Sequence, residues 1–221
     1  MIRLTLIFSL FFGAYSSAQN SEFQVWTEAG LKGDIIKKMD WMVDVKARFG
    51  RDGLDQFLPE AGIDYKVKKW FKPSITYRAI IAENKYGNYK LAHRINLNAN
   101  FKKQLDRFRV GARLRYQYAF ERVGVQAEYD ADFDQAIRFK PFVEYDINNS
   151  IFTPKISAEL FYDPIYGPRG QRFTKLRIGI GSSFELDGPH SVSFKYQLDK
   201  WFYDYERGLR HVLALSYGYK L

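Results

Sequence analysis

The chain contains no cysteine, and only three of its 221 residues are histidines. Without cysteine there is no disulfide, no thiol nucleophile, no thiolate metal site and no N-terminal cysteine to carry a lipid. Small exported domains usually depend on disulfides for stability, so this chain needs another source of stability. The shortage of histidine also leaves few candidates for general acid–base catalysis.

A second absence concerns long hydrophobic runs. Beyond the first nineteen residues, no stretch is apolar for the roughly 20 residues that a membrane-spanning helix needs. At the N-terminus, Arg3 precedes the apolar segment Leu4–Ala14, and Ser17-Ala18-Gln19 offers a small-residue cleavage site. This pattern predicts a secretory signal peptide over residues 1–19 and a single exported domain over residues 20–221. Export argues against nucleic acid as a partner and connects the net charge of +9 with anionic lipid headgroups or an anion-attracting lumen.

The remainder of the chain alternates apolar and polar side chains. Between residues 39 and 49, the odd-numbered positions are apolar and most even-numbered positions are charged. Because successive strand residues point to opposite faces, this pattern predicts a two-faced strand. The pattern is strong in ten runs and weaker in residues 23–31; the strong runs are 39–49, 57–67, 71–81, 89–101, 108–120, 137–145, 152–162, 176–186, 192–198 and 213–221.

Several of these runs are long enough for a tilted strand to cross a bilayer, and aromatic residues cluster at their ends, as at Phe71, Tyr89, Phe101, Phe120 and Tyr162. Export, strand length and aromatic ends together predict an all-β fold. The specific prediction is an antiparallel transmembrane β-barrel of 10–12 strands, an up-and-down meander, monomeric and in the outer membrane of a Gram-negative bacterium. The alternative is a soluble lipocalin-like or sandwich protein with its apolar face inward, but so many strands would then enclose a large apolar cavity.

The number of strands poses a conflict. An even number is expected when both chain ends lie on the periplasmic side. Strand directions alternate along a meander. Counting back from the last strand, the weak run at residues 23–31 would have the opposite direction to the one that a periplasmic N-terminus requires. Either this run is not part of the wall, or a further strand lies within Val123–Tyr129.

The polar face of the strands is rich in arginine and carries several carboxylates, including Asp44. In a narrow lumen these charges are expected to pair into a network, with arginine forks holding carboxylates. The alternative is an anion-preferring passage or pocket, since arginine outnumbers the acids. The predicted lumen network comprises Arg48, Glu60, Asp64, Arg78, Arg94, Arg113, Arg115, Arg138, Glu144, Glu159 and Arg177.

The order of short motifs along the chain resembles a known family of small predicted outer-membrane proteins, catalogued as domain of unknown function 2490. The motifs are Ala92-His93-Arg94-Ile95, Arg113-Leu114-Arg115-Tyr116-Gln117, Ile137-Arg138-Phe139, Pro154 with Glu159-Leu160, Leu176-Arg177-Ile178-Gly179 and the closing tyrosine-rich strand. The resemblance covers essentially the whole exported domain. It implies a barrel and no established activity.

Three further patterns have weaker functional implications. His93 and His211 fall on the apolar face, where a lipid hydrolase would need them, but Ser216 lies on the opposite face from His211 and an interfacial role fits better. Residues 130–134 resemble the start of a calcium loop, but Gln135 and Pro141 occupy positions that need glycine and glutamate. Gly179 and Gly181 lie within a strand and form no nucleotide-binding motif. The sequence therefore predicts no metal and no cofactor.

The sequence thus favours a structural barrel or a narrow passage for small solutes or anions. A lipid-modifying hydrolase of the outer membrane and an adhesin or assembly partner acting through external loops are the alternatives. The expected partners are membrane lipid, lipopolysaccharide and the barrel-assembly machinery.

Overall fold

The computed structural model describes residues 21–83, 88–122, 125–126, 135–165, 170–203 and 208–221. The predicted signal peptide and the calcium-loop-like residues 130–134 lie outside this set. Within it, every regular element is a β-strand, and no helix is long and apolar enough to cross a membrane. The strands are β1 (Ser21–Ile36), β2 (Met39–Gly50), β3 (Gly53–Tyr65), β4 (Phe71–Glu83), β5 (Tyr89–Leu105), β6 (Phe108–Arg122), β7 (Val125–Gln126), β8 (Ala136–Tyr145), β9 (Phe152–Asp163), β10 (Arg172–Glu185), β11 (His190–Trp201) and β12 (Leu209–Lys220).

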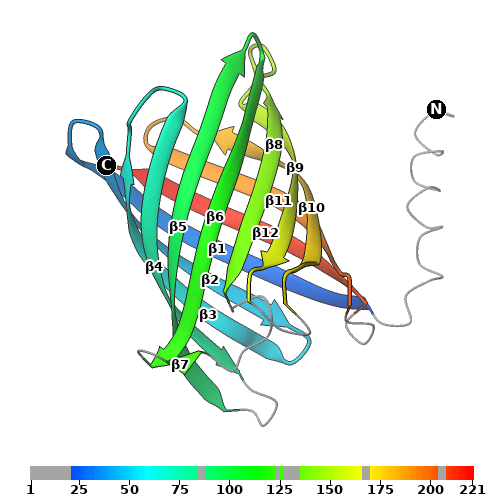
Figure 1. Ribbon diagram of the computed structural model, residues 1–221. Helices are drawn as coiled ribbons and strands as arrows, with labels where there is room; N and C mark the ends of the chain where they lie inside the picture. The colour runs from blue at the N-terminus through cyan, green and yellow to red at the C-terminus, as the bar shows by residue number, and fades with distance from the viewer. Residues whose placement is uncertain (1–20, 84–87, 123–124, 127–134, 166–169, 204–207) are drawn as a thin grey trace, which may run out of the picture.

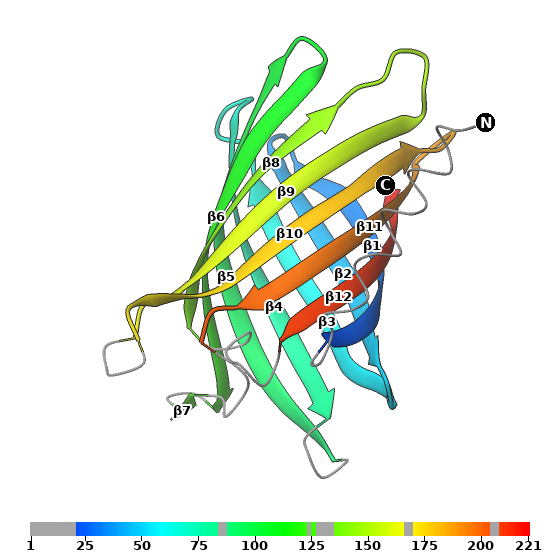
Figure 2. The same ribbon diagram turned by 90° about the vertical axis from the view of Figure 1, so that its right-hand side faces the viewer.

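Among the described strands, eleven close into a single barrel (Figures 1 and 2). Each wall strand pairs antiparallel with the next wall strand in the chain, and β6 pairs directly with β8. The two-residue β7 pairs only with the end of β6 and adds nothing to the closed wall. The predicted all-β meander of 10–12 strands is therefore confirmed.

The barrel closes between its first and last strands, and these two strands run parallel. Residues Ser21 to Lys32 of β1 pair in register with Leu209 to Lys220 of β12. The weak first run is thus a wall strand, and no additional full strand within Val123–Tyr129 is needed. The expectation of an even number was wrong for this chain, because a parallel seam lets an odd number of strands close with all their backbone groups paired.

The odd number places the two ends of the barrel domain on opposite sides (Figures 1 and 2). One side, called here the loop end, holds the start of β1 and the longer connections at 84–88, 164–171 and 202–208. The other side, called the turn end, holds the end of β12 and short turns such as 37–38 and 106–107. Residue positions in the lumen are described below relative to these two ends.

The wall is apolar outside and polar inside. Leu97, at the middle of β5, is 50% exposed on the outer surface, whereas its neighbours Asn96 and Asn98 are buried in the lumen. The same arrangement exposes Ile75, Ile156, Ile178 and many other large apolar side chains on the outside. This polarity is the reverse of the inward apolar face that the lipocalin-like alternative would have.

Aromatic side chains gather near both ends of the outer wall. At the turn end, the Phe71 and Phe101 rings stack with centroids 5.0 Å apart, and Phe152 meets Phe184 at 4.9 Å. At the loop end, Tyr162 meets Phe173 at 5.4 Å. Bands of this kind occur where barrel walls pass through the two interfaces of a bilayer.

The parallel seam leads to a direct test with introduced cysteines. Val25 and Leu213 are partners across β1 and β12, so their Cα atoms lie within the distance that a disulfide spans. In a chain without cysteine, Val25→Cys combined with Leu213→Cys is expected to form a disulfide on mild oxidation. Val25→Cys combined with Tyr217→Cys, four positions further along β12, is expected to form none. Gel mobility of the oxidised, folded barrel gives the result, and a cross-link only in the second pair would contradict the seam.

Candidate functional site

The predicted lumen residues all lie on the inner side of the wall, but they belong to more than one cluster. The central cluster gathers around Glu159 of β9, which is 1% exposed. Arg113 from β6 donates to Glu159 Oε1 at 2.8 Å, and Arg138 Nε from β8 donates to the same oxygen at 3.0 Å. Arg177 from β10 lies 4.0 Å from the second carboxylate oxygen. One acid therefore holds three arginines from three strands.

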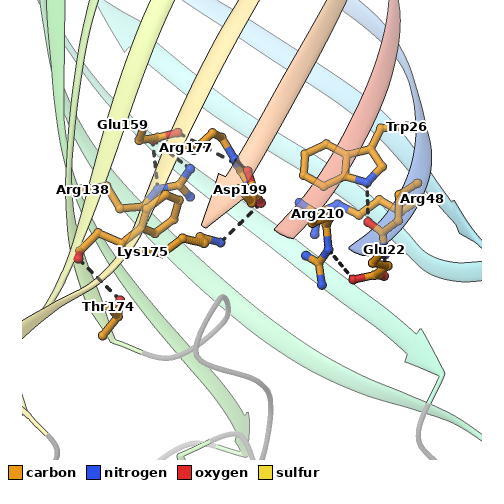
Figure 3. Close-up of polar contacts among 12 residues, drawn as sticks. Glu22, Trp26, Arg48, Arg138, Glu159, Thr174, Lys175, Arg177, Asp199 and Arg210 are labelled. Carbon is orange, nitrogen blue, oxygen red and sulfur yellow. Dashed lines mark hydrogen bonds and ion pairs between the residues drawn. The ribbon is translucent and has the colours of Figure 1, made fainter. Parts of the chain in front are cut away.

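Arg177 joins this cluster to a second buried acid, Asp199 of β11 (Figure 3). Arg177 donates to both carboxylate oxygens of Asp199 at 2.6 Å, the bidentate arrangement that a planar guanidinium favours. Lys175 Nζ lies 3.8 Å from Asp199 and also sits over the ring of Phe161 at 4.2 Å. Since Asp199 and Lys175 are almost completely buried, these charges are compensated by one another and not by water.

Next along the wall, β1, β2 and β12 contribute a cluster built on Trp26, whose ring centre lies 5.1 Å from the guanidinium of Arg177 (Figure 3). The guanidinium of Arg48 lies 3.9 Å from the centre of the Trp26 ring, and the indole N–H donates to Gln24 at 2.8 Å. Arg210 of β12 donates to Glu22 of β1 at 2.8 Å, a bond that crosses the parallel seam. Cation–π contacts of this kind stabilise an arginine where few carboxylates are present.

The remaining predicted residues form smaller groups. Arg78 pairs with Glu60, Arg115 donates to Asn98 at 2.5 Å, and Arg94 is only 2% exposed. Asp64 belongs to a cluster at the turn end, where it meets Lys32 at 3.2 Å and Lys72 at 2.8 Å. Glu144 pairs with Lys155 at 2.6 Å and Arg109 at 3.1 Å. Eight of the predicted residues therefore line one cavity, whereas Asp64, Arg94 and Glu144 lie outside it; the eight are Arg48, Glu60, Arg78, Arg113, Arg115, Arg138, Glu159 and Arg177.

Apolar side chains fill the lumen beside these charges at the loop end. Leu58, Ile80, Ala82, Ala92 and Ala119 form a cluster from β3 to β6, and each is at most 2% exposed. Phe161 and Trp201 are also buried on the inner side. In the described part of the chain, the loop-end half of the lumen is therefore packed like a protein core.

The turn-end half is open. A cavity of about 750 Å³ is lined by residues of β1, β2, β10, β11 and β12, among them Glu28, Lys32, Asp44 and Lys220. Deeper in the lumen, a cavity of about 280 Å³ reaches Arg48, Glu159 and Arg177. The two cavities share Glu28, Met42, Asp44 and Ser216, so the lumen is a vestibule that narrows from the turn end to the arginine clusters.

Comparison with known proteins adds a family to this geometry. Residues 23–203 match the model of a family described as a protein of unknown function (DUF2490). The chain belongs to this family. The match confirms the resemblance seen in the motif order. No curated protein is similar enough to the chain to count as a match. The family description assigns no activity, so the lumen itself is the guide to what this family member does.

The sequence prediction missed several members of the clusters. Four inward residues lie outside the predicted lumen set, although each is an even number of positions from another inward residue of its strand; they are Glu22, Lys175, Asp199 and Arg210. Asp199 and Arg210 were missed because β11 and β12 extend beyond the expected runs, to Trp201 and from Leu209. Trp26 was missed because it lies in the run of residues 23–31, where the alternation is weaker. Extending each alternation in both directions would have found Glu22, Lys175, Asp199 and Arg210, which lie just beyond the ends of the runs.

All three histidines bond to tyrosine on the outer wall. The distances from Nδ1 to the hydroxyl oxygen are 2.6 Å for His93 with Tyr77, 2.7 Å for His190 with Tyr217 and 2.5 Å for His211 with Tyr196. These contacts give the rings an amphipathic setting near the ends of the wall, as expected for an interfacial band. Among the described residues, no group of three histidine, aspartate or glutamate side chains is arranged to hold a metal ion.

Proposed function

We propose that this protein is an outer-membrane β-barrel of a Gram-negative bacterium whose lumen is a blind vestibule and not an open pore. The membrane location is supported by the apolar outer wall, the aromatic bands and the signal-peptide pattern at the N-terminus. Closed pairing of every wall strand is also what a sheet needs in hydrocarbon, where unpaired backbone groups are costly.

The observation that carries the closed lumen is the burial of inward side chains in the loop-end half. Arg94, Lys175 and Asp199 are each at most 2% exposed, and none of them lines the cavity that reaches Glu159. The apolar cluster of β3 to β6 is packed beside them. An anion crossing the barrel would have to displace buried ion pairs and apolar side chains together, which is energetically costly.

The orientation follows from the connections. In outer-membrane barrels the short turns face the periplasm and the long loops face outward. The vestibule of this protein would then open to the periplasm, and the packed half would lie toward the cell surface. The protein would contact lipid and lipopolysaccharide through its wall and the barrel-assembly machinery during insertion.

Among the alternatives, a narrow anion passage needs a continuous cavity through the arginine clusters. A lipid hydrolase needs a nucleophile beside a histidine, and here tyrosine hydroxyls occupy the Nδ1 positions. An adhesin would act through the external connections, several of which lie outside the described residues. No contact in the described residues favours either of these two activities over a closed structural barrel.

Conductance in a planar lipid bilayer tests the closed lumen. The refolded protein, shown to be folded by its heat-dependent gel mobility, is expected to insert without producing current steps. Reproducible anion-selective steps that change in Arg113→Ala would contradict the proposal and establish a narrow passage. Inserted protein that stays silent, with insertion verified by protease protection of the wall, is the expected result.

A further inference from the structure

A third cavity in the turn-end half of the lumen has the chemistry of a site for an oxyanion. Its volume is about 250 Å³, and it lies against the inner face of β8 to β12, which are consecutive in the wall (Figure 2). It adjoins the deeper cavity of about 280 Å³ described above, because Lys140, Lys195 and Ser216 line both cavities. The polar side chains that matter here are Lys140, Lys155, Lys195, Ser157, Ser193 and Ser216.

Two inward residues of β10 that line this cavity, Gly179 and Gly181, have no side chain. A Cβ at Gly179 would lie 3.1 Å from Ser157 Oγ and 3.5 Å from Cδ of Lys195. A Cβ at Gly181 would lie 2.3 Å from the carbonyl oxygen of Phe194, which leaves no room for a side chain. One wall of the cavity is therefore formed by backbone atoms of β10, and lysine and serine side chains of the neighbouring strands surround it.

The cations around this cavity are only partly compensated. Lys155 is bound to Glu144 at 2.6 Å, and Glu144 is the one acid among the residues that line the cavity. Within the described residues, Lys140 and Lys195 make neither an ion pair nor a hydrogen bond. The nearby Glu159 is already held by Arg113 and Arg138. Two half-buried lysines thus face a small polar space without forming an ion pair with any described residue.

The serines add hydrogen-bond donors to these charges. In the described part of the chain, the hydroxyls of Ser157, Ser193 and Ser216 have no hydrogen-bond partner within the protein. Hydroxyl and ammonium donors arranged around one space suit a ligand with several charged oxygens. A phosphate group has more acceptor oxygens than a carboxylate and carries more negative charge near neutral pH, so it uses this set of donors more completely.

We propose that this cavity binds a phosphate group of a small soluble solute that enters from the turn end. Lys140 and Lys195 neutralise the phosphate charge, and the three serine hydroxyls donate to its oxygens. The volume accommodates inorganic phosphate or a small phosphomonoester. The ligand is a soluble molecule and not a membrane lipid, because the wall separates the cavity from the apolar outer surface. The proposal goes beyond the closed barrel and does not depend on whether the lumen conducts.

Titration calorimetry on the protein refolded in micelles tests the proposal, with inorganic phosphate and glycerol 3-phosphate as probes. One binding event per barrel is expected for at least one probe, with a dissociation constant below about 1 mM. Lys140→Gln and Lys195→Gln are each expected to weaken binding about tenfold or more, as for the loss of a charged hydrogen bond. Lys103→Gln removes the same charge from an exposed position outside the cavity and is expected to change binding less than about twofold.

The two probes separate the possible sources of the phosphate group. Binding of both identifies a phosphate subsite, whereas binding of glycerol 3-phosphate alone identifies a phosphomonoester site. Binding of neither probe, or equal weakening in Lys103→Gln, overturns the proposal. Gly179→Val, which adds a side chain to this backbone wall without changing charge, is expected to abolish binding in protein that still shows heat-dependent gel mobility. The binding measurement does not involve conductance. A lack of phosphate binding would therefore leave the closed-lumen proposal standing, and current steps in the bilayer would leave the phosphate-site proposal standing.

Discussion

Glu159→Gln is expected to destabilise the folded barrel by about 3–5 kcal/mol, the usual cost of removing one partner from a buried ion pair. Glu159 is the common acceptor for Arg113 and Arg138 and lies 4.0 Å from Arg177. Glutamine has nearly the same shape but no charge, so three arginines would lose much of their compensation where water is excluded. Urea unfolding of the barrel in lipid vesicles measures the difference in the free energy of unfolding.

Glu185→Gln is the matched control for this change. Glu185 also lies on the inner side of β10, but at the exposed turn end, and its loss is expected to matter by less than about 0.5 kcal/mol. The double variant Glu159→Gln with Arg138→Gln is expected to recover part of the stability, because it removes one uncompensated charge. Equal stability of Glu159→Gln and the wild type would show that the central cluster contributes nothing net to folding.

Leu97→Arg is expected to destabilise the barrel in vesicles by about 2–4 kcal/mol, the cost of a cation at the middle of a lipid-facing barrel wall. Leu97 lies at the centre of β5 and is 50% exposed on the outer surface. In hydrocarbon the new guanidinium would lack water and partners, whereas on a soluble protein an exposed arginine at this position would be nearly neutral. The same urea titration in vesicles gives the measurement.

Leu105→Arg provides the depth control on the same strand. Leu105 is the last residue of β5, at the turn end, and is 46% exposed. Near the bilayer interface the same substitution is expected to cost only about 0–1 kcal/mol. Equal effects at the two positions would contradict a wall that crosses hydrocarbon, and so would a Leu97→Arg variant as stable as the wild type.

The location of the charged clusters also has a consequence for the vestibule. The acids Glu159 and Asp199 are placed deep in the lumen, where they hold Arg113, Arg138 and Arg177. Nearer the turn end, Lys32, Lys72 and Lys155 pair with acids, whereas Lys140 and Lys195 form no ion pair with a described residue. Nine lysine and arginine side chains but only four carboxylates line the deeper cavity at the floor of the vestibule, which is the arrangement expected of a blind pocket that attracts anions.

Much of this fold follows from the sequence by itself. Alternation with a period of two determines which side chains share a face, because every strand residue points opposite to its neighbour. Residues 39–49 alone show both faces, and the absence of other periodicities predicts an all-β chain. The inner position of the predicted lumen residues, from Arg48 to Arg177, follows from the same parity once the charged face is turned inward. The motif order was also sufficient to indicate the family.

Tertiary structure decided what parity leaves open. Parity does not say which strand lies next to which across the closure, so the parallel pairing of β1 with β12 was not foreseen. Nor does parity give the height of a residue in the lumen, which depends on strand tilt and register. The pair Arg177 with Asp199 depends on the register of the β10–β11 hairpin, and the pair Arg210 with Glu22, 188 positions apart, forms only when the barrel closes. The same register leaves Lys140 and Lys195 without acids and packs the loop-end half, because contacts across a lumen are set by closure and not by neighbours in the chain.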